Sequence, residues 1–331
     1  MPGRYYGLSE YFMKVYGEKL VKLSLDGGFT CPNRDGTLSA QGCIFCSESG
    51  SGEFAGAMIE GKKNQGASIR EQIDSQKQLL SAKWASNAYI GYFQNYTNTY
   101  KPIEVLEQLY AEALDNDGVK GLAIATRPDC IKPEHIELFK QSKVMWVELG
   151  LQTIHDERAG WLRRHYDFND FKVALKLLKE GNIPVVVHLI AGLPGESKVN
   201  FIESVKAISA LGVFGVKFHM LNILKGTELE TFYLQSPFHV LSESEYIEWV
   251  CDALEYLNPE TVVHRLTGDG ERSMLLAPKW VLNKRSVING INKSLAARNS
   301  VQGQAFEILE KFETINTGYS QSCYCDSDTD N

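Results

Sequence analysis

Three cysteines near the start of the chain have the types and spacing to hold an iron-sulfur cluster. Cys31, Cys43 and Cys46 lie in the stretch TCPNRDGTLSAQGCIFC, directly after a strand-like segment. Glycine and proline between them allow the loop to bend three thiolates toward one site, and thiolates are the usual ligands of such clusters. Three ligands leave one iron open, and an open iron is a place for chemistry.

Two plainer interpretations of these cysteines stay open. Zinc also binds cysteines separated by two residues, as Cys43 and Cys46 are. No histidine or cysteine follows closely to complete a tetrahedral zinc site. A structural pair without metal is the other alternative. The spacing favours a cluster over both.

Composition describes an ordinary globular chain. Its 331 residues are 44% hydrophobic and 23% charged, with a net charge of -7. The negative charge argues against a protein that coats nucleic acid nonspecifically, although a local basic face is compatible with it. The sequence shows no signal peptide and no membrane span, so we expect a cytoplasmic protein with no membrane partner and with reduced thiols. Cys130 and Cys251 are then expected to be buried.

Short β-rich runs alternate with longer amphipathic segments, which is typical of βα units around a parallel sheet. We expect a helix over 68–83 and a loop over 47–66 that covers the cysteines. The six predicted strands are 20–25, 88–94, 121–125, 144–151, 184–190 and 215–221.

Polar residues stand where several of these runs end, which is the edge at which parallel sheets build their sites. Gln94 and Asn95 end the second run. Alternation within the fourth run places Glu148 and Gln152 on one face, so Glu148 is expected to point into the barrel. A carboxylate there needs a partner, and we leave open whether that partner is Arg127 or a ligand.

A glycine-rich turn over 190–196 follows the fifth run. Gly192 and Gly195 would let the backbone approach a planar ligand closely, and helix-start amides could bind it. A simple joint between strand and helix is the alternative. Arg164 lies at the end of another helical segment, where a solvated cation is the plain interpretation.

Together these features resemble the radical S-adenosylmethionine (SAM) superfamily, from about Lys19 to Leu229. The resemblance implies an α/β fold, a partial (β/α)6 TIM-like barrel with N- and C-terminal extensions. It also implies a [4Fe-4S] cluster on Cys31, Cys43 and Cys46, with SAM on the open iron. The second strand ends in GYFQN rather than GGE, so Gln94 or Asn95 stands in as the contact of the SAM amino group. The residues that the resemblance assigns to SAM are Phe45, Gln94, Asn95, Glu148, Gln152, Arg164, Gly192 and Glu196.

More narrowly, the chain is similar to the YtqA/YhcC group, near the Elongator catalytic subunit and the MiaB-type enzymes. The similarity lies in FTCPNRDG through GCIFC, TRPD, ELGLQT, HLIAGLPGE and KGTELE. It implies a 5′-deoxyadenosyl radical that acts on the wobble uridine of transfer RNA, converting a 5-carboxymethylaminomethyl side chain to 5-aminomethyl. It also implies a one-electron donor such as flavodoxin or ferredoxin, and no DNA partner.

A basic tract near the C-terminus offers separate support for an RNA partner. No acidic residue occurs over 272–306. Its cations could neutralise phosphates and its tryptophan could stack a base, whereas a solvated helix face is the alternative. The candidate RNA contacts are Lys279, Trp280, Lys284, Arg285, Lys293 and Arg298.

We expect four segments: an N-terminal helical extension over 1–18, the barrel over 19–232, a helical and basic extension over 233–316, and a disordered acidic tail over 317–331 that contains Cys323 and Cys325. Two rival functions remain at this point. One is a radical SAM enzyme acting on a substrate other than RNA. The other is a noncatalytic iron-sulfur or zinc protein that binds RNA.

Overall fold

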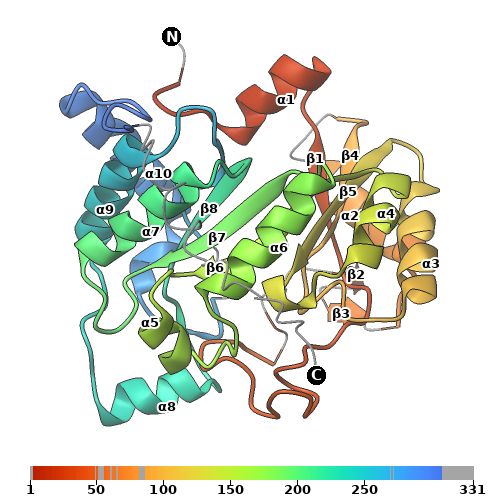
Figure 1. The fold of residues 1–331 in the computed structure, drawn as a ribbon, viewed down its shortest axis with the longest axis horizontal. Helices are drawn as coiled ribbons and strands as arrows, with labels where there is room; N and C mark the ends of the chain where they lie inside the picture. The colour runs from red at the N-terminus through yellow and green to blue at the C-terminus, as the bar shows by residue number, and fades with distance from the viewer. Residues whose placement is uncertain are drawn as a thin grey trace, which may run out of the picture.

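Seven parallel strands form one curled sheet, which confirms the predicted partial barrel (Figure 1). The computed structural model describes residues 3–48, 50, 56–59, 62–64, 66–81, 86–268, 270 and 272–307. The strand order is β1-β4-β5-β6-β7-β8-β10, and every neighbouring pair is parallel. The strands are β1 (Val21–Leu25), β4 (Tyr89–Phe93), β5 (Val119–Thr126), β6 (Val144–Gln152), β7 (Val185–Ala191), β8 (Gly215–Met220) and β10 (Val262–Arg265).

Helices cover the outer face of the sheet, and the two sheet halves are flanked by different groups of them (Figure 1). Short 3-10 turns, η1 (Pro128–Cys130) and η2 (Lys279–Leu282), complete the connections. The helices are α1 (Leu8–Tyr16), α2 (Ile69–Ser81), α3 (Ile103–Leu114), α4 (Pro133–Gln141), α5 (Asp156–Trp161), α6 (Phe168–Glu180), α7 (Lys198–Ala210), α8 (Glu228–Gln235), α9 (Glu243–Tyr256) and α10 (Lys284–Ala297).

All six predicted strands are present, and their sequences explain why. The central strands β5 to β8 are rich in apolar residues and are mostly buried on both faces, as the central strands of a helix-covered parallel sheet must be. The edge strand β1 instead buries alternate residues. The predicted helix over 68–83 is α2, and the buried positions of Cys130 and Cys251 are confirmed.

The seventh strand, β10, was not predicted. It pairs with β8 at the edge of the sheet, and its register shifts between Val263 and Arg265. Only four residues long, and ending in His264 and Arg265, it lacks the apolar run that marks the other strands. Two antiparallel pairs are also present: β2 (Ala57–Ile59) with β3 (Lys62–Asn64), and β9 (Ile223–Leu224) with β11 (Leu275–Ala277).

The end of the barrel at which the strands begin is closed by apolar side chains. Phe12 of α1 packs against Trp146, with ring centroids 6.3 Å apart, beside Val186. Figure 1 shows α1 over this end and the loop that follows β1 at the opposite end. Among the described residues this end is therefore closed, which leaves the carboxyl ends of the strands for a site, as in other parallel barrels.

The predicted loop over 47–66 contains the short pair β2 and β3. The acidic tail, with Cys323 and Cys325, lies outside the described residues. The segment boundaries stay a prediction, although α1 falls within 1–18 and β10 shows that the segment after 232 contributes to the main sheet. None of the described helices combines the length and apolar composition needed to cross a bilayer.

Candidate active site

A cavity of about 270 Å³ opens at the carboxyl ends of the strands, and the three predicted cysteines line it. Phe45, Gln94, Glu148 and Gln152 line the same cavity. These four residues come from the cysteine loop and from the ends or interiors of β4 and β6, so the curvature of the sheet brings together positions that are far apart in sequence. The structure thus brings these predicted site residues together in one cavity.

The cysteines are held by their own loop. Arg34 donates to the Cys46 carbonyl at 3.0 Å, and the Cys46 amide donates to the Cys43 carbonyl at 3.0 Å. A hydrogen bond with the Cys46 thiol lowers the pKa of the Cys43 thiol to about 7, against the opposing effect of burial and with help from the charge of Arg127. A thiol that ionises near neutral pH is suited to bind metal, because the thiolate is the ligand.

Two further donors reach the cysteine sulfurs. The Asn33 side-chain amide lies 3.4 Å from the Cys43 sulfur and donates to the Arg163 carbonyl at 2.7 Å. A guanidinium nitrogen of Arg127 lies 3.9 Å from the Cys31 sulfur. Hydrogen bonds and positive charge near ligating sulfurs tune the potential of an iron-sulfur cluster. Sequence reasoning did not single out Asn33, although an asparagine two residues after a ligand cysteine was the available signal.

Glu148 points into the barrel as predicted, and it lies at the centre of a buried polar network. Its Oε2 accepts hydrogen bonds from the Tyr92 hydroxyl at 2.7 Å, from His188 at 2.8 Å and from Lys217. Its Oε1 accepts from the Trp146 indole at 3.0 Å, and Lys22 lies 3.5 Å away.

The charges around Glu148 keep it ionised. Burial would raise its pKa, but Lys217, Lys22 and the His188 hydrogen bond hold the pKa well below its usual range. Burial lowers the pKa of His188 to about 4, although the hydrogen bond to Glu148 opposes this. His188 is therefore neutral near pH 7 and donates its Nε2 proton to Glu148.

The suggested pair between Glu148 and Arg127 is not formed. Arg127 instead donates to Asp129 through two nitrogens, at 3.0 and 2.7 Å. Arg127 and Asp129 are only two residues apart, so their pair is local. Lys217 and Lys22 contact Glu148 from β8 and β1. A single lysine within the apolar strand GVKFHM was a signal for an inward-facing charge, by the same alternation that identified Glu148.

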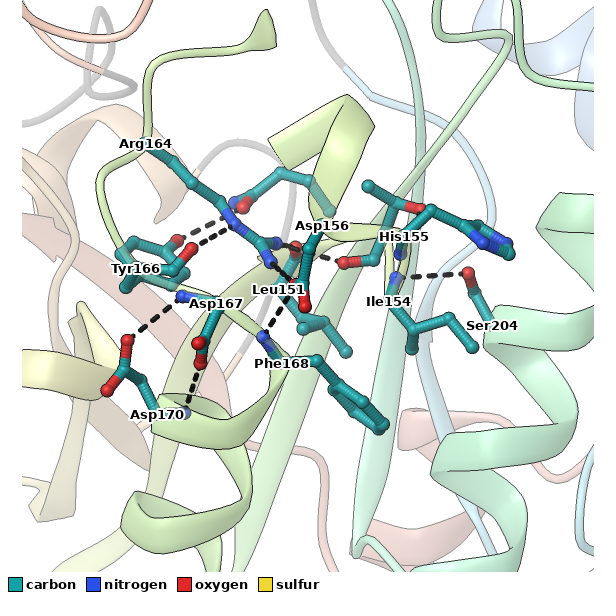
Figure 2. A network of polar contacts seen from close by, with 12 residues as sticks. Leu151, Ile154, His155, Asp156, Arg164, Tyr166, Asp167, Phe168, Asp170 and Ser204 are labelled. Carbon is teal, nitrogen blue, oxygen red and sulfur yellow. Dashed lines mark hydrogen bonds and ion pairs between the residues drawn. The ribbon is translucent and has the colours of Figure 1, made fainter. Parts of the chain in front are cut away.

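Arg164 is not a solvated helix end, because its side chain is fully buried beside β6. It does not line the cavity; Figure 2 shows its guanidinium among Tyr166, Leu151 and Asp156. Its Nε donates to the Tyr166 carbonyl at 2.8 Å and another nitrogen donates to the Thr153 carbonyl at 3.0 Å, while one nitrogen, 3.8 Å from Asp156, makes no hydrogen bond. In this structure Arg164 joins the segment before α5 to the segment after it, between β6 and α6.

Three other predicted SAM contacts lie outside the cavity lining. Asn95 donates to Asp26 at 2.8 Å. Gly192 adopts φ +82 and lines a separate small pocket beside Trp280. Glu196 accepts from Thr153 at 2.9 Å, and its other oxygen is buried without a partner. Burial raises the pKa of Glu196 to about 7, with the Thr153 hydrogen bond opposing. Their roles toward SAM stay predictions.

The basic tract is divided between internal contacts and surface. Trp280 donates to the Leu241 carbonyl at 2.9 Å, Lys279 donates to the Leu275 carbonyl, and Arg298 pairs with Asp252. Lys284 is half-buried on α10, whereas Arg285 and Lys293 of the same helix are exposed.

Comparison with known families identifies this architecture. A family model described as "Radical SAM superfamily" matches residues 34–208, and one described as "Radical_SAM C-terminal domain" matches residues 213–297. The chain belongs to the radical SAM superfamily. The superfamily match begins three residues after Cys31. It therefore includes Cys43 and Cys46 but not the first strand or Cys31.

The chain is also similar to individual proteins. The chain is 41% identical to the protein YtqA of Bacillus subtilis over 311 residues, 93% of this chain and 94% of YtqA. It is 27% identical over 185 residues to a tRNA uridine(34) acetyltransferase of Methanocaldococcus infernus, 53% of this chain but 31% of the enzyme. The solved structure of Methanocaldococcus infernus Elp3 superposes with a TM-score of 0.64 at 18% identity, over 86% of this chain and 64% of that chain, and at this identity it shows the fold alone.

The residues of this radical SAM chain fit the cofactors that the family uses. In the described part of the chain no three His, Cys, Asp or Glu side chains converge closely enough for a single metal ion. A four-iron cluster takes each thiolate on a different iron, so its ligands need not converge on one point. Thr97, His219 and Asn222 line the cavity and each has a buried polar atom without a partner, as the wall of a polar ligand site would.

Proposed function

We propose that this chain is a radical SAM enzyme that modifies the wobble uridine of transfer RNA, converting 5-carboxymethylaminomethyl to 5-aminomethyl. Three thiols and Glu148 in one cavity carry the proposal for the enzyme. Similarity to a tRNA uridine(34) acetyltransferase supports the choice of substrate. Flavodoxin or ferredoxin would supply the electron.

Each part of the cavity has a role in this proposal. Cys31, Cys43 and Cys46 would hold the [4Fe-4S] cluster, and Gln94 and Gln152 would contact SAM. When bound, the cluster and SAM would supply a 5′-deoxyadenosyl radical able to take a hydrogen atom from the uridine side chain. Tyr166 donates to the Gly150 carbonyl at 2.8 Å and lies 3.1 Å from the Gln152 side chain, so it holds Gln152 at the cavity wall. The protein positions the reactants and excludes water, while the cofactor carries the reactive chemistry.

The enzymatic part is tested by anaerobic reconstitution with SAM and dithionite. We expect 5′-deoxyadenosine from the wild-type protein and none from Cys43→Ala. Cys251→Ala is the matched control, because it removes the same atom from a buried cysteine that does not line the cavity. Equal 5′-deoxyadenosine from wild type and Cys43→Ala would contradict the proposal.

The substrate is tested separately by analysing wobble nucleosides from a strain that lacks this protein. We expect 5-carboxymethylaminomethyluridine to accumulate at the expense of 5-aminomethyluridine. An unchanged ratio would remove tRNA as the substrate and leave the radical chemistry standing.

A further inference from the structure

One wall of the cavity carries polar side chains that have no role in the proposed cofactor binding. His188 of β7, His219 of β8 and Arg265 of β10 all line the cavity. The two imidazole rings are 5.1 Å apart. Because β7, β8 and β10 are neighbours in the sheet, these residues form one continuous surface.

An irregularity in β10 turns Arg265 toward the cavity. Val263 pairs with Val216, and the next pair joins Arg265 to Lys217. Between these two pairs β10 advances by two residues while β8 advances by one. With regular pairing Arg265 would lie beside Phe218, whose side chain belongs to the outer core under the helices. The shift places Arg265 beside Lys217, which points inward to Glu148. Bulges commonly re-aim a side chain next to a site in this way.

Cationic side chains outnumber carboxylates among the described residues that line the cavity. Arg34, Arg127 and Arg265 line the cavity, whereas Glu148 is the single carboxylate among the described lining residues. The Glu148 charge is matched by Lys217 and Lys22, and Arg127 is matched by Asp129. Glu148 therefore already has two cations of its own, apart from the guanidinium of Arg265 at the cavity wall.

Hydrogen-bond donors face the same space. The Nε2 atom of His219 is buried and has no partner. A neutral imidazole donates one proton, and a guanidinium carries five N–H groups in a fork that matches a carboxylate, so Arg265 can bind an anion besides any partner it has in the protein. A buried donor without a partner is costly, and a ligand oxygen would satisfy it.

We propose that the wall formed by His188, His219 and Arg265 binds the carboxylate of the substrate, with Arg265 as the main contact and His219 as the second donor. The inference rests on the proposed function for the identity of that substrate. The 5-carboxymethylaminomethyl group carries a carboxylate, and the 5-aminomethyl product lacks it. Such a wall distinguishes substrate from product and favours product release.

The test compares two free nucleosides, 5-carboxymethylaminomethyluridine and 5-aminomethyluridine, by anaerobic titration calorimetry on the reconstituted protein. Wild type is expected to bind the carboxylate-bearing nucleoside about tenfold or more tightly, the range of a hydrogen bond to a charged group. Arg265→Gln should abolish this preference and Arg265→Lys should leave an intermediate one. The matched control is Arg70→Gln, an exposed arginine of α2 that pairs with Asp115.

SAM also has a carboxylate, so its affinity is measured on the same variants. The inference expects SAM to bind Arg265→Gln as tightly as wild type. A loss of SAM affinity with the nucleoside preference intact would instead assign Arg265 to the cofactor and overturn the inference. If Arg265→Gln does not fold, judged by its melting transition, Arg265→Lys decides: a full wild-type preference contradicts a bidentate contact.

The remaining outcomes separate this inference from the proposed function. A wild-type protein that binds both nucleosides alike, or neither, overturns the inference. If the protein converts wobble uridine but Arg265→Gln keeps the preference, only the inference fails. If the Arg265-dependent preference is found while wobble nucleosides are unchanged in the deletion strain, the tRNA proposal fails and the carboxylate site stands.

Discussion

Glu148 shows how a charged residue is tolerated inside the barrel. It is 1% exposed, and its two oxygens contact five side chains from five strands, namely Lys22, Tyr92, Trp146, His188 and Lys217. A buried charge is costly unless it is paired and hydrogen-bonded, and here both conditions are met. The network therefore fixes the relative positions of the strands under the proposed site.

Removing Lys217 should destabilise the protein strongly. In Lys217→Met, Glu148 loses its closest cation but keeps Lys22, so we expect the free energy of unfolding to fall by about 3 kcal/mol, the lower end for a broken buried pair. Urea denaturation measures this. The control is Lys198→Met, whose lysine lies 2.6 Å from Glu248 but is 38% exposed, and which should cost below about 1 kcal/mol. Equal losses in the two variants would contradict the burial argument.

Glu196 should make stability depend on pH. The folded protein holds this proton up to about pH 7, whereas the unfolded chain releases it near 4.5. Between these pH values the folded state binds more protons than the unfolded state. The contribution of Glu196 to the free energy of unfolding is therefore complete below pH 4.5 and is lost as the pH rises through about 7. Relative to Glu196→Gln, wild type should lose roughly 3 kcal/mol across this window. Denaturant titrations over the window, without added SAM, measure it.

A control isolates the buried carboxyl in that experiment. Glu107→Gln removes an exposed carboxylate from α3 and should leave the pH dependence of wild type unchanged. A constant stability difference between wild type and Glu196→Gln at all pH values would show that the pKa of Glu196 is not raised.

Alternation along one strand predicted the direction of Glu148 but could not predict its partners. Side-chain direction follows from the period of the strand, which is local. Lys22 and Lys217 reach Glu148 from strands 126 and 69 residues away in the chain, and only the curl of the sheet decides that they meet it. Arg127 is closer to Glu148 in sequence than either lysine, but it forms an ion pair with Asp129 instead.

At the scale of elements, strands with long apolar runs were predictable and the edge strand was not. Six strands carry enough apolar residues, alternating with polar ones in β1, to be recognised alone. In β10 the apolar residues are Val262 and Val263, and its pairing depends on the exposed edge of β8. The sequence therefore did not indicate Arg265 as a site residue.

The turn between β7 and α7 depends on glycine at position 192. Gly192 and Gly226 both have left-handed backbones, with φ +82 and +76, so alanine costs about 1–2 kcal/mol of backbone strain at either. At Gly192 a new Cβ would also lie 2.9 Å from Leu241, whereas nothing lies within 4 Å at Gly226. Gly192→Ala should therefore destabilise by about 1–3 kcal/mol more than Gly226→Ala. Urea denaturation of both variants measures the difference, and equal losses would rule out the contact.

In the whole molecule, the two ends of the barrel have different tasks. Apolar packing under α1 closes one end, and the cysteine loop with the cavity occupies the other. The segment matched by the C-terminal family model contributes β8 and β10, which carry His219 and Arg265 of the cavity wall, and also α10. A single piece of chain thus links the proposed substrate wall to the exposed basic residues.

The exposed basic residues of α10 are expected to contribute to RNA binding. The protein has a net charge of -7, so attraction of tRNA must come from a local surface, and Arg285 and Lys293 of α10 are exposed in a segment without acidic residues. Arg285→Gln/Lys293→Gln should weaken tRNA binding and reduce the slope of log affinity against log salt by up to about 1.8, since each phosphate contact contributes about 0.9. Filter binding at several salt concentrations measures the slope. Lys120→Gln/Lys140→Gln removes the same charge from exposed positions on β5 and α4 and should leave the slope near that of wild type. If the two double variants lower the slope equally, general electrostatics rather than α10 attracts the RNA.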